Sequence, residues 1–135
     1  RLYFNVGSKV STNLATALGF LFNTVTPIQK ADLATFSMVR FVATQGVTGS
    51  ANSRLRLNYA TSYQSTAAGY GQVLSTEGTN GGVQLSINAA NQVADTGWLT
   101  LIQAARTNNL FLAVVASGGD GAADPSFGPI YVEFR

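Results

Sequence analysis

Carboxylates are the main candidates for acid–base chemistry in this chain, because it contains neither histidine nor cysteine. Their absence removes catalytic triads, thiol nucleophiles and the usual zinc, iron and copper ligand sets. Glycoside hydrolysis needs two carboxylates that flank a bond. The only glutamates are Glu77 and Glu133, and neither lies in a setting typical of a general acid. We therefore expect a non-enzymatic protein with no catalytic residues and no cofactor.

A glycine-rich run over residues 118–124 holds two aspartates, Asp120 and Asp124. Carboxylates and loop carbonyls are the hard oxygen ligands that calcium prefers. However, the spacing does not match an EF-hand loop and no bidentate glutamate follows. A further ligand from Asp95 or Asp32 would strengthen the calcium interpretation. The same run is typical of a hairpin loop, so we assign no metal site, and calcium binding at this loop stays the alternative.

Aromatic residues offer a different chemistry, because exposed rings stack on sugars or make protein contacts. Trp98 enters an apolar run, and we expect it to anchor the core. Tyr63 and Tyr70 lie instead in a loop-like stretch rich in serine, threonine, alanine and glycine. We select Tyr63 and Tyr70 as the candidate interface or ligand contacts.

Charge is scarce: Asp, Glu, Lys and Arg make up 10% of the chain, against about 25% in ordinary soluble domains. The basic residues are scattered, and only Arg54 and Arg56 lie close together, so we expect no nucleic-acid partner. No apolar run approaches the length of a membrane span, and we expect no membrane partner. A neutral polar surface lacks the repulsion that keeps monomers apart, which favours a component of a larger assembly. The alternative is a secreted domain with a polar skin.

The elements that must carry these residues are predicted to be strands, because the dominant period is two. Leu55, Leu57 and Tyr59 alternate with polar neighbours, as expected of a strand with one buried face. The remaining alternating strands are expected over residues 36–44, 83–87 and 130–134. Continuous apolar runs that suit central strands occur at residues 18–22, 98–102 and 110–116.

Residues 1–17 are expected to form an extended N-terminal arm or an edge strand, with a possible edge strand over residues 2–6. Short helical turns are expected near Lys30 and before Arg106. Seven to nine short strands separated by glycine-rich turns predict one all-β domain over residues 1–135. The fold class is therefore a two-sheet antiparallel jelly-roll sandwich.

The strand succession resembles that of carbohydrate-binding jelly-roll modules. The resemblance runs through residues 40–42, 55–57, 97–101, 110–114 and 128–134. It implies a glycan ligand, in an appended module or a receptor-binding tail tip, and an extracellular location. The calcium and sugar ligands of those modules have no counterparts that can be placed in this sequence.

The small size, the low charge and the loops rich in threonine, asparagine, alanine and glycine are similar to those of jelly-roll cement or decoration proteins of tailed-phage capsids. This resemblance implies a dimer or trimer on the capsid surface that clamps neighbouring subunits of the major capsid protein. The N-terminal segment and the long loops would make the contacts. Capsid decoration explains the neutral surface better than glycan binding does, and we take it as the expected function.

Overall fold

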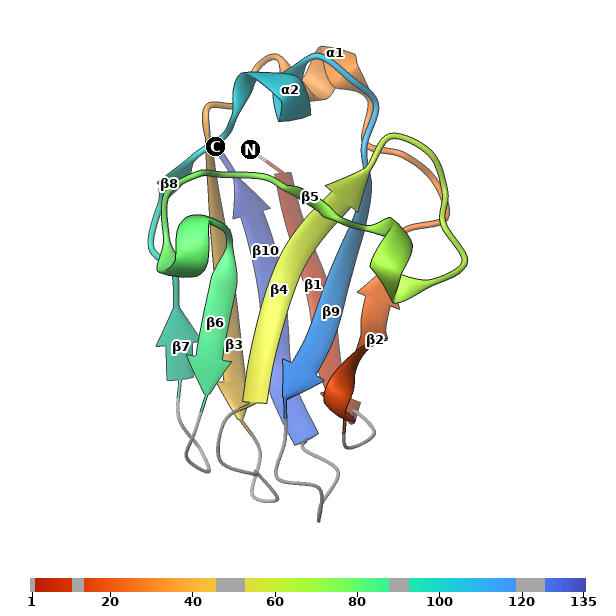
Figure 1. The fold of residues 1–135 in the computed structure, drawn as a ribbon. Coiled ribbons are helices and arrows are strands. Elements are labelled where there is room, and N and C mark those ends of the chain that lie inside the picture. Colours follow the sequence, from red (N-terminus) through yellow and green to blue (C-terminus); the bar gives the residue numbers. More distant parts are fainter. Residues whose placement is uncertain (1, 11–13, 46–52, 88–92, 119–125) are drawn as a thin grey trace.

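The computed structural model describes residues 2–10, 14–45, 53–87, 93–118 and 126–135. They form two antiparallel sheets packed face to face (Figure 1). Sheet A contains β1 (Leu2–Val10), β3 (Met38–Gln45), β7 (Val93–Asp95), β8 (Leu99–Thr100) and β10 (Ser126–Phe134). Sheet B contains β2 (Leu14–Asn23), β4 (Ser53–Ala60), β5 (Gln72–Val73), β6 (Gln84–Ile87) and β9 (Phe111–Gly118).

The chain crosses repeatedly between the two sheets and stays in one sheet only from β4 to β6 and from β7 to β8, which gives the jelly-roll connectivity. Sheet A has the order β1-β10-β3, and both β7 and β8 pair with the far side of β3. Sheet B has the order β2-β9-β4, and both β5 and β6 pair with the far side of β4. The ten described strands thus fill eight positions, the number expected of a jelly roll.

The core lies between the sheets and follows the predicted alternation. Leu55, Leu57 and Tyr59 of β4 point into it, and Ile130 and Phe134 approach it from β10. All five side chains are buried. The period-two pattern therefore determines which face of each of these strands is buried.

Two of the three predicted central strands are not central. Residues 18–22 belong to β2, which lies at the edge of sheet B, and residues 98–102 contain only the two-residue edge strand β8. By contrast β9, which holds the third run, lies between β2 and β4, and residues 112–116 are buried. An apolar run signals burial, but it does not distinguish a central strand from an edge strand.

Trp98 is partly exposed, so the prediction that it anchors the core is wrong. The guanidinium carbon of Arg135 lies 4.2 Å from the centroid of the Trp98 ring. A cation–π contact at the surface therefore takes the place of core packing for this side chain.

Short helical turns connect the strands: α1 (Lys30–Leu33), η1 (Ala67–Gly69), η2 (Thr79–Gly81) and α2 (Gln103–Arg106). The turns expected near Lys30 and Arg106 are confirmed as α1 and α2, which lie together at one end of the sandwich (Figure 1). None of the helices in the described ranges is long and apolar enough to cross a membrane. At the start of the chain, β1 is an edge strand of sheet A, which agrees with the edge-strand alternative.

Candidate interaction surface along β1 and β2

The loop of residues 61–71 folds back over the outer face of sheet B. There Ala67 and Tyr70 pack with Ala113 and Val115 of β9 in a second, smaller apolar cluster. The side-chain amide of Asn58 on β4 donates a 2.8 Å hydrogen bond to the Tyr70 carbonyl oxygen. The loop is therefore fastened to the sheet by both apolar packing and a buried hydrogen bond.

Tyr70 is 1% exposed, so the expectation that it is a surface contact is wrong. Its hydroxyl oxygen lies 3.3 Å from both the backbone nitrogen and the carbonyl oxygen of Gln64, and it exchanges hydrogen bonds with both. The composition of the loop predicted exposure, but the ring turns under the loop and fixes it to the sheet.

Tyr63 is 50% exposed and lies on the outside of the same loop. Its ring meets that of Phe111 on β9 edge-to-face, with centroids 6.4 Å apart and planes at 75°. Val25 is another exposed apolar residue close to this pair in the fold, because the backbone amide of Thr24 bonds to the carbonyl of Leu112. One of the two predicted contact residues is therefore placed where it can meet a partner.

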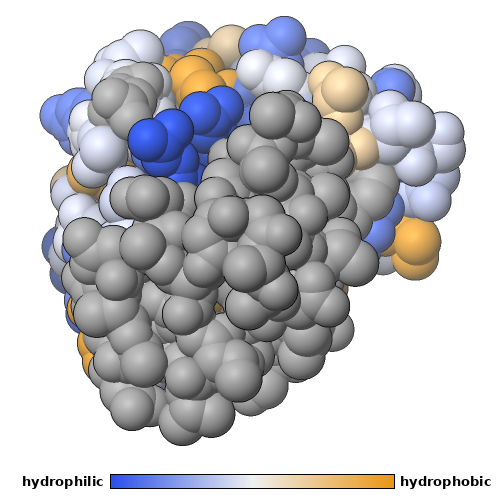
Figure 2. All heavy atoms as spheres, turned by 60° about the horizontal axis from the view of Figure 1, so that its bottom comes forward, coloured by the Kyte–Doolittle hydropathy of each residue, from blue (hydrophilic) through white to orange (hydrophobic). Residues whose placement is uncertain are grey.

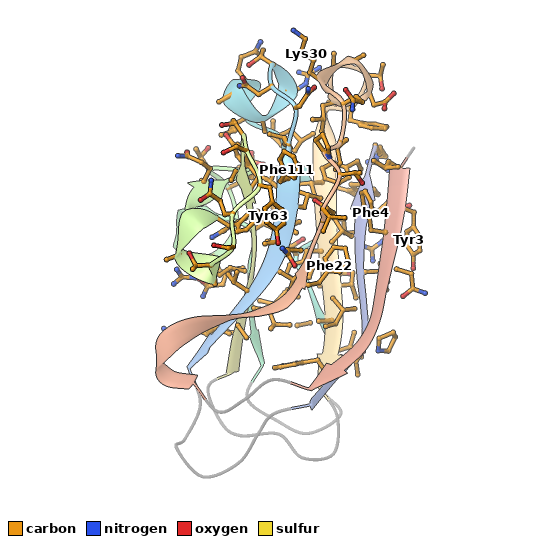
Figure 3. The ribbon with its side chains drawn as sticks, turned by 90° about the vertical axis from the view of Figure 1, so that its right-hand side faces the viewer. Tyr3, Phe4, Phe22, Lys30, Tyr63 and Phe111 are labelled. Atoms are coloured by element: carbon orange, nitrogen blue, oxygen red, sulfur yellow. The ribbon has the colours of Figure 1, made fainter. Side chains whose placement is uncertain are left out.

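Phe22 of β2 and Phe4 of β1 are partly buried against the main core. The two strands belong to different sheets and do not pair with each other. Figure 3 shows both rings in the region between these two edges, with Tyr63 and Phe111 to one side and Tyr3 beyond β1. Phe4 and Phe22 therefore close the side of the sandwich, but incompletely.

Tyr3 is 53% exposed on the outer side of β1, and its ring centroid lies 5.4 Å from that of Tyr131. We call Tyr63, Phe111, Phe22, Phe4 and Tyr3 the aromatic band. It follows the side of the molecule that faces the viewer in Figure 3. Sequence reasoning identified Tyr63 only. Phe22 and Phe111 stand in continuous apolar runs that predicted burial, and Tyr3 and Phe4 stand in the expected edge strand of residues 2–6.

Both edge strands on this side are interrupted. The pairing of β1 with β10 shifts register on either side of Gly7, which has a φ of 77°. The pairing of β2 with β9 also shifts register twice. Such bulges hinder the addition of a further strand to a sheet edge. Contact with a partner on this side is therefore expected through side chains.

The ion pair between β3 and β7 does not involve the aromatic band, although Glu133 of β10 stands opposite Tyr3 in the pairing of β1 with β10. Arg40 on β3 pairs with Asp95 on β7, and its Nε lies 3.0 Å from Asp95 Oδ1. The hydrogen bond from Arg40, together with one from the Gly97 amide, lowers the pKa of Asp95 despite partial burial. Lys30, the charged residue labelled in Figure 3, lies at the top of that view, in α1 at one end of the sandwich. Figure 2 shows another face, on which apolar residues in the described part form separate small patches.

Carboxylates do not converge in the described part of the chain. Glu77 Oε2 accepts a 2.8 Å hydrogen bond from the Thr100 amide, so it has a structural partner. No group of three or more metal-ligating side chains occurs among the described residues. The aspartates proposed as calcium ligands, Asp120 and Asp124, lie outside the described residues, while Asp95 is committed to Arg40.

The fold and this surface define a two-sheet jelly roll with an aromatic side. Comparisons with protein-family models, curated protein sequences and solved structures find no match to the chain.

Proposed function

We propose that this chain is a non-enzymatic virion structural protein, a capsid decoration or cement protein that stabilises a phage shell through protein–protein contacts. The aromatic band is the observation that carries this proposal. Tyrosine and phenylalanine are enriched in protein interfaces, where they contribute large contact areas. Tyr63 and Tyr3 are each half-exposed at the ends of the band, so both are available to a partner.

The low charge of the chain supports the same function. Charged groups are depleted at interface centres, because each one must be desolvated on binding. The proposed partners are the major capsid protein and further copies of this chain in a dimer or trimer, on the outside of the capsid. The interrupted edges of β1 and β2 support contact through side chains. Strand addition at such edges could instead continue from copy to copy without closing into a dimer or trimer.

The test compares one double variant with one single variant, in which serine replaces apolar residues that are exposed or partly exposed. Tyr63→Ser/Phe111→Ser disrupts the aromatic band, and Val93→Ser removes a 64% exposed valine on β7 as the matched control. We expect the unmodified chain and Val93→Ser to sediment as dimers or trimers and to co-sediment with purified capsid shells. In the double variant, the affinity of the chain for further copies of itself and its affinity for the shells should each fall about tenfold or more.

Circular dichroism of each variant checks that the sandwich is still folded. A chain that stays monomeric at every concentration and never co-sediments with shells contradicts the proposal. Equal losses in Val93→Ser and in the double variant would also contradict it, because the aromatic band would then have no special role.

Glycan binding is the second candidate function, and exposed tyrosine rings favour it. Tyr63 offers a half-exposed ring, and Tyr3 and Tyr131 form a tilted pair on the outer face of sheet A. Aromatic rings of this kind can stack on sugars. Binding on a glycan array that is lost in Tyr63→Ala would favour this function over capsid decoration, and an array without signal would count against it.

A further inference from the structure

A polar hollow opens on the outer face of sheet B, beside the edge of β4 with which both β5 and β6 pair. Asn58 lies opposite Val73 of β5, and Arg56 lies opposite Gln84 of β6. Between β5 and β6 the chain leaves the sheet and returns through η2. The resulting hollow has a volume of about 140 Å³, and its lining includes Arg56, Asn58, Thr79 and Gln84.

Gln84 presents an unused hydrogen-bond donor beside this hollow. The residue is 5% exposed, and its Oε1 accepts a 3.0 Å hydrogen bond from Arg56 Nε. Its Nε2 is buried and has no hydrogen-bond partner. Because Arg56 needs the oxygen as its acceptor, turning the amide over would not satisfy the group. Buried donors of this kind are uncommon in folded proteins, and a bound ligand is one way to satisfy them.

The hollow combines this amide with a positive charge. The described hydrogen bond of Arg56 uses Nε, which leaves the terminal guanidinium nitrogens for a ligand. No carboxylate lines the described walls of the hollow, and the Asn58 amide is already committed to Tyr70. A guanidinium beside a carboxamide donor matches a carboxylate, which accepts several hydrogen bonds in one plane.

A larger hollow of about 410 Å³ adjoins this one and shares Thr79 and Gln84 with it. Its lining also includes Ser86, Asp95 and Thr96. Hydroxyl side chains can donate to and accept from the hydroxyls of a ligand, and a carboxylate accepts from them. Asp95 in this lining is already paired with Arg40, whereas Arg56 has terminal guanidinium nitrogens left for a ligand, so the anion is favoured at the Arg56 end and the hydroxyls at the other.

We propose that the two hollows together bind an acidic sugar, with its carboxylate at Arg56 and Gln84 and its hydroxyls toward Thr79 and Ser86. The site binds its ligand without reacting with it. It uses no residue of the aromatic band, so it is independent of the proposed role in capsid decoration and of stacking at Tyr63.

The test is a titration of the isotopically labelled full chain with sodium glucuronate, followed by amide chemical shifts. We expect saturable shifts around Thr79 and Gln84 and none along the aromatic band. Arg56→Gln and Gln84→Glu should each weaken binding about tenfold or more, because the first removes the charge and the second replaces the donor by a negative group. Arg54→Gln is the matched control, since Arg54 is exposed two residues away on the same strand, and its affinity should stay within about twofold.

Thermal unfolding of each variant checks that the fold is intact. Glucose and acetate are tested as control ligands beside glucuronate. Glucose lacks the carboxylate and acetate lacks the hydroxyls, so both should bind at least about tenfold more weakly than glucuronate. The absence of saturable shifts would overturn the proposal. Equal affinity for glucose or acetate, or an equal loss in Arg54→Gln and Arg56→Gln, would overturn it as well.

Discussion

The two narrow sides of this sandwich differ in how they end the core. Along β1 and β2, phenylalanine side chains partly close the space between two strands that do not pair, and tyrosines extend the apolar surface outward. Along β6 and β7, the surface is hollowed and lined by serine, threonine, glutamine and aspartate together with Val93 and Ala94. One side therefore favours contact with another protein, and the other favours a small polar ligand.

The difference also concerns what shapes each side. The aromatic side depends on side-chain packing, because Tyr63 is presented by a loop that Tyr70 fixes to the sheet. The polar side depends more on backbone conformation, because the segment before β6 contains Gly78 and Gly81, both with positive φ. Substitutions that act on packing and on backbone conformation should separate the two sides.

The largest effect is expected from Tyr70→Ala. Tyr70 is 1% exposed, and removing a buried aromatic ring lowers the free energy of unfolding by roughly 3 to 5 kcal/mol. Tyr63→Ala is the matched control, and since Tyr63 is half-exposed it should cost about 1 kcal/mol or less. Chemical denaturation measures both values. Equal losses would show that the loop of residues 61–71 does not depend on Tyr70.

An intermediate effect is expected from Gly78→Ala on the polar side. Gly78 has a φ of 88°, and a Cβ there would lie 2.6 Å from the carbonyl oxygen of Gly82. The strained backbone and the close contact together should lower the free energy of unfolding by about 1 to 3 kcal/mol. Gly81→Ala shares the positive φ but meets no atom within 4 Å, so it should cost only about 1 kcal/mol. If denaturation shows equal losses, the contact with Gly82 does not constrain this segment.

The alternation of Leu55, Leu57 and Tyr59 was enough to predict a strand and its buried face, because period two is a local property of the sequence. The continuous apolar run of residues 110–116 also predicted a buried strand, which the fold forms as β9 (Phe111–Gly118), but its central position could not be read from the run. The two-sheet class followed from many such segments separated by turns. Where local pattern decides the structure, the prediction and the fold agree.

The surface features depend on contacts between distant parts of the chain. Tyr70 is buried because its loop returns over Ala113 and Val115, more than forty positions away in the sequence, and loop composition carries no sign of this. Arg56 and Gln84 meet across the β4–β6 pair, and their register could not be read before the pairing was known. Tyr63 was identified from its loop, but the phenylalanines beside it were not.

The smallest effect is expected from the ion pair between Arg40 and Asp95, which distinguishes the two sides by pH. The hydrogen bond from Arg40 holds the pKa of Asp95 below its ordinary value of 3.8. A depressed pKa stabilises the fold fully above the unfolded value, and this contribution is lost as the pH falls through the folded value. Both side chains are about one-third exposed, so the contribution should be only about 0.2 to 1 kcal/mol.

Asp95→Asn should therefore lower stability at neutral pH by about that amount and flatten the loss of stability between about pH 5 and pH 2. Tyr3→Phe on the aromatic side is the control, because a tyrosine hydroxyl does not titrate in this range. Urea denaturation at a series of pH values measures both variants. If the free energy of unfolding changes with pH in the same way in Asp95→Asn and in the unmodified chain, other carboxylates control acid stability. In that case pH would not separate the polar side from the aromatic side.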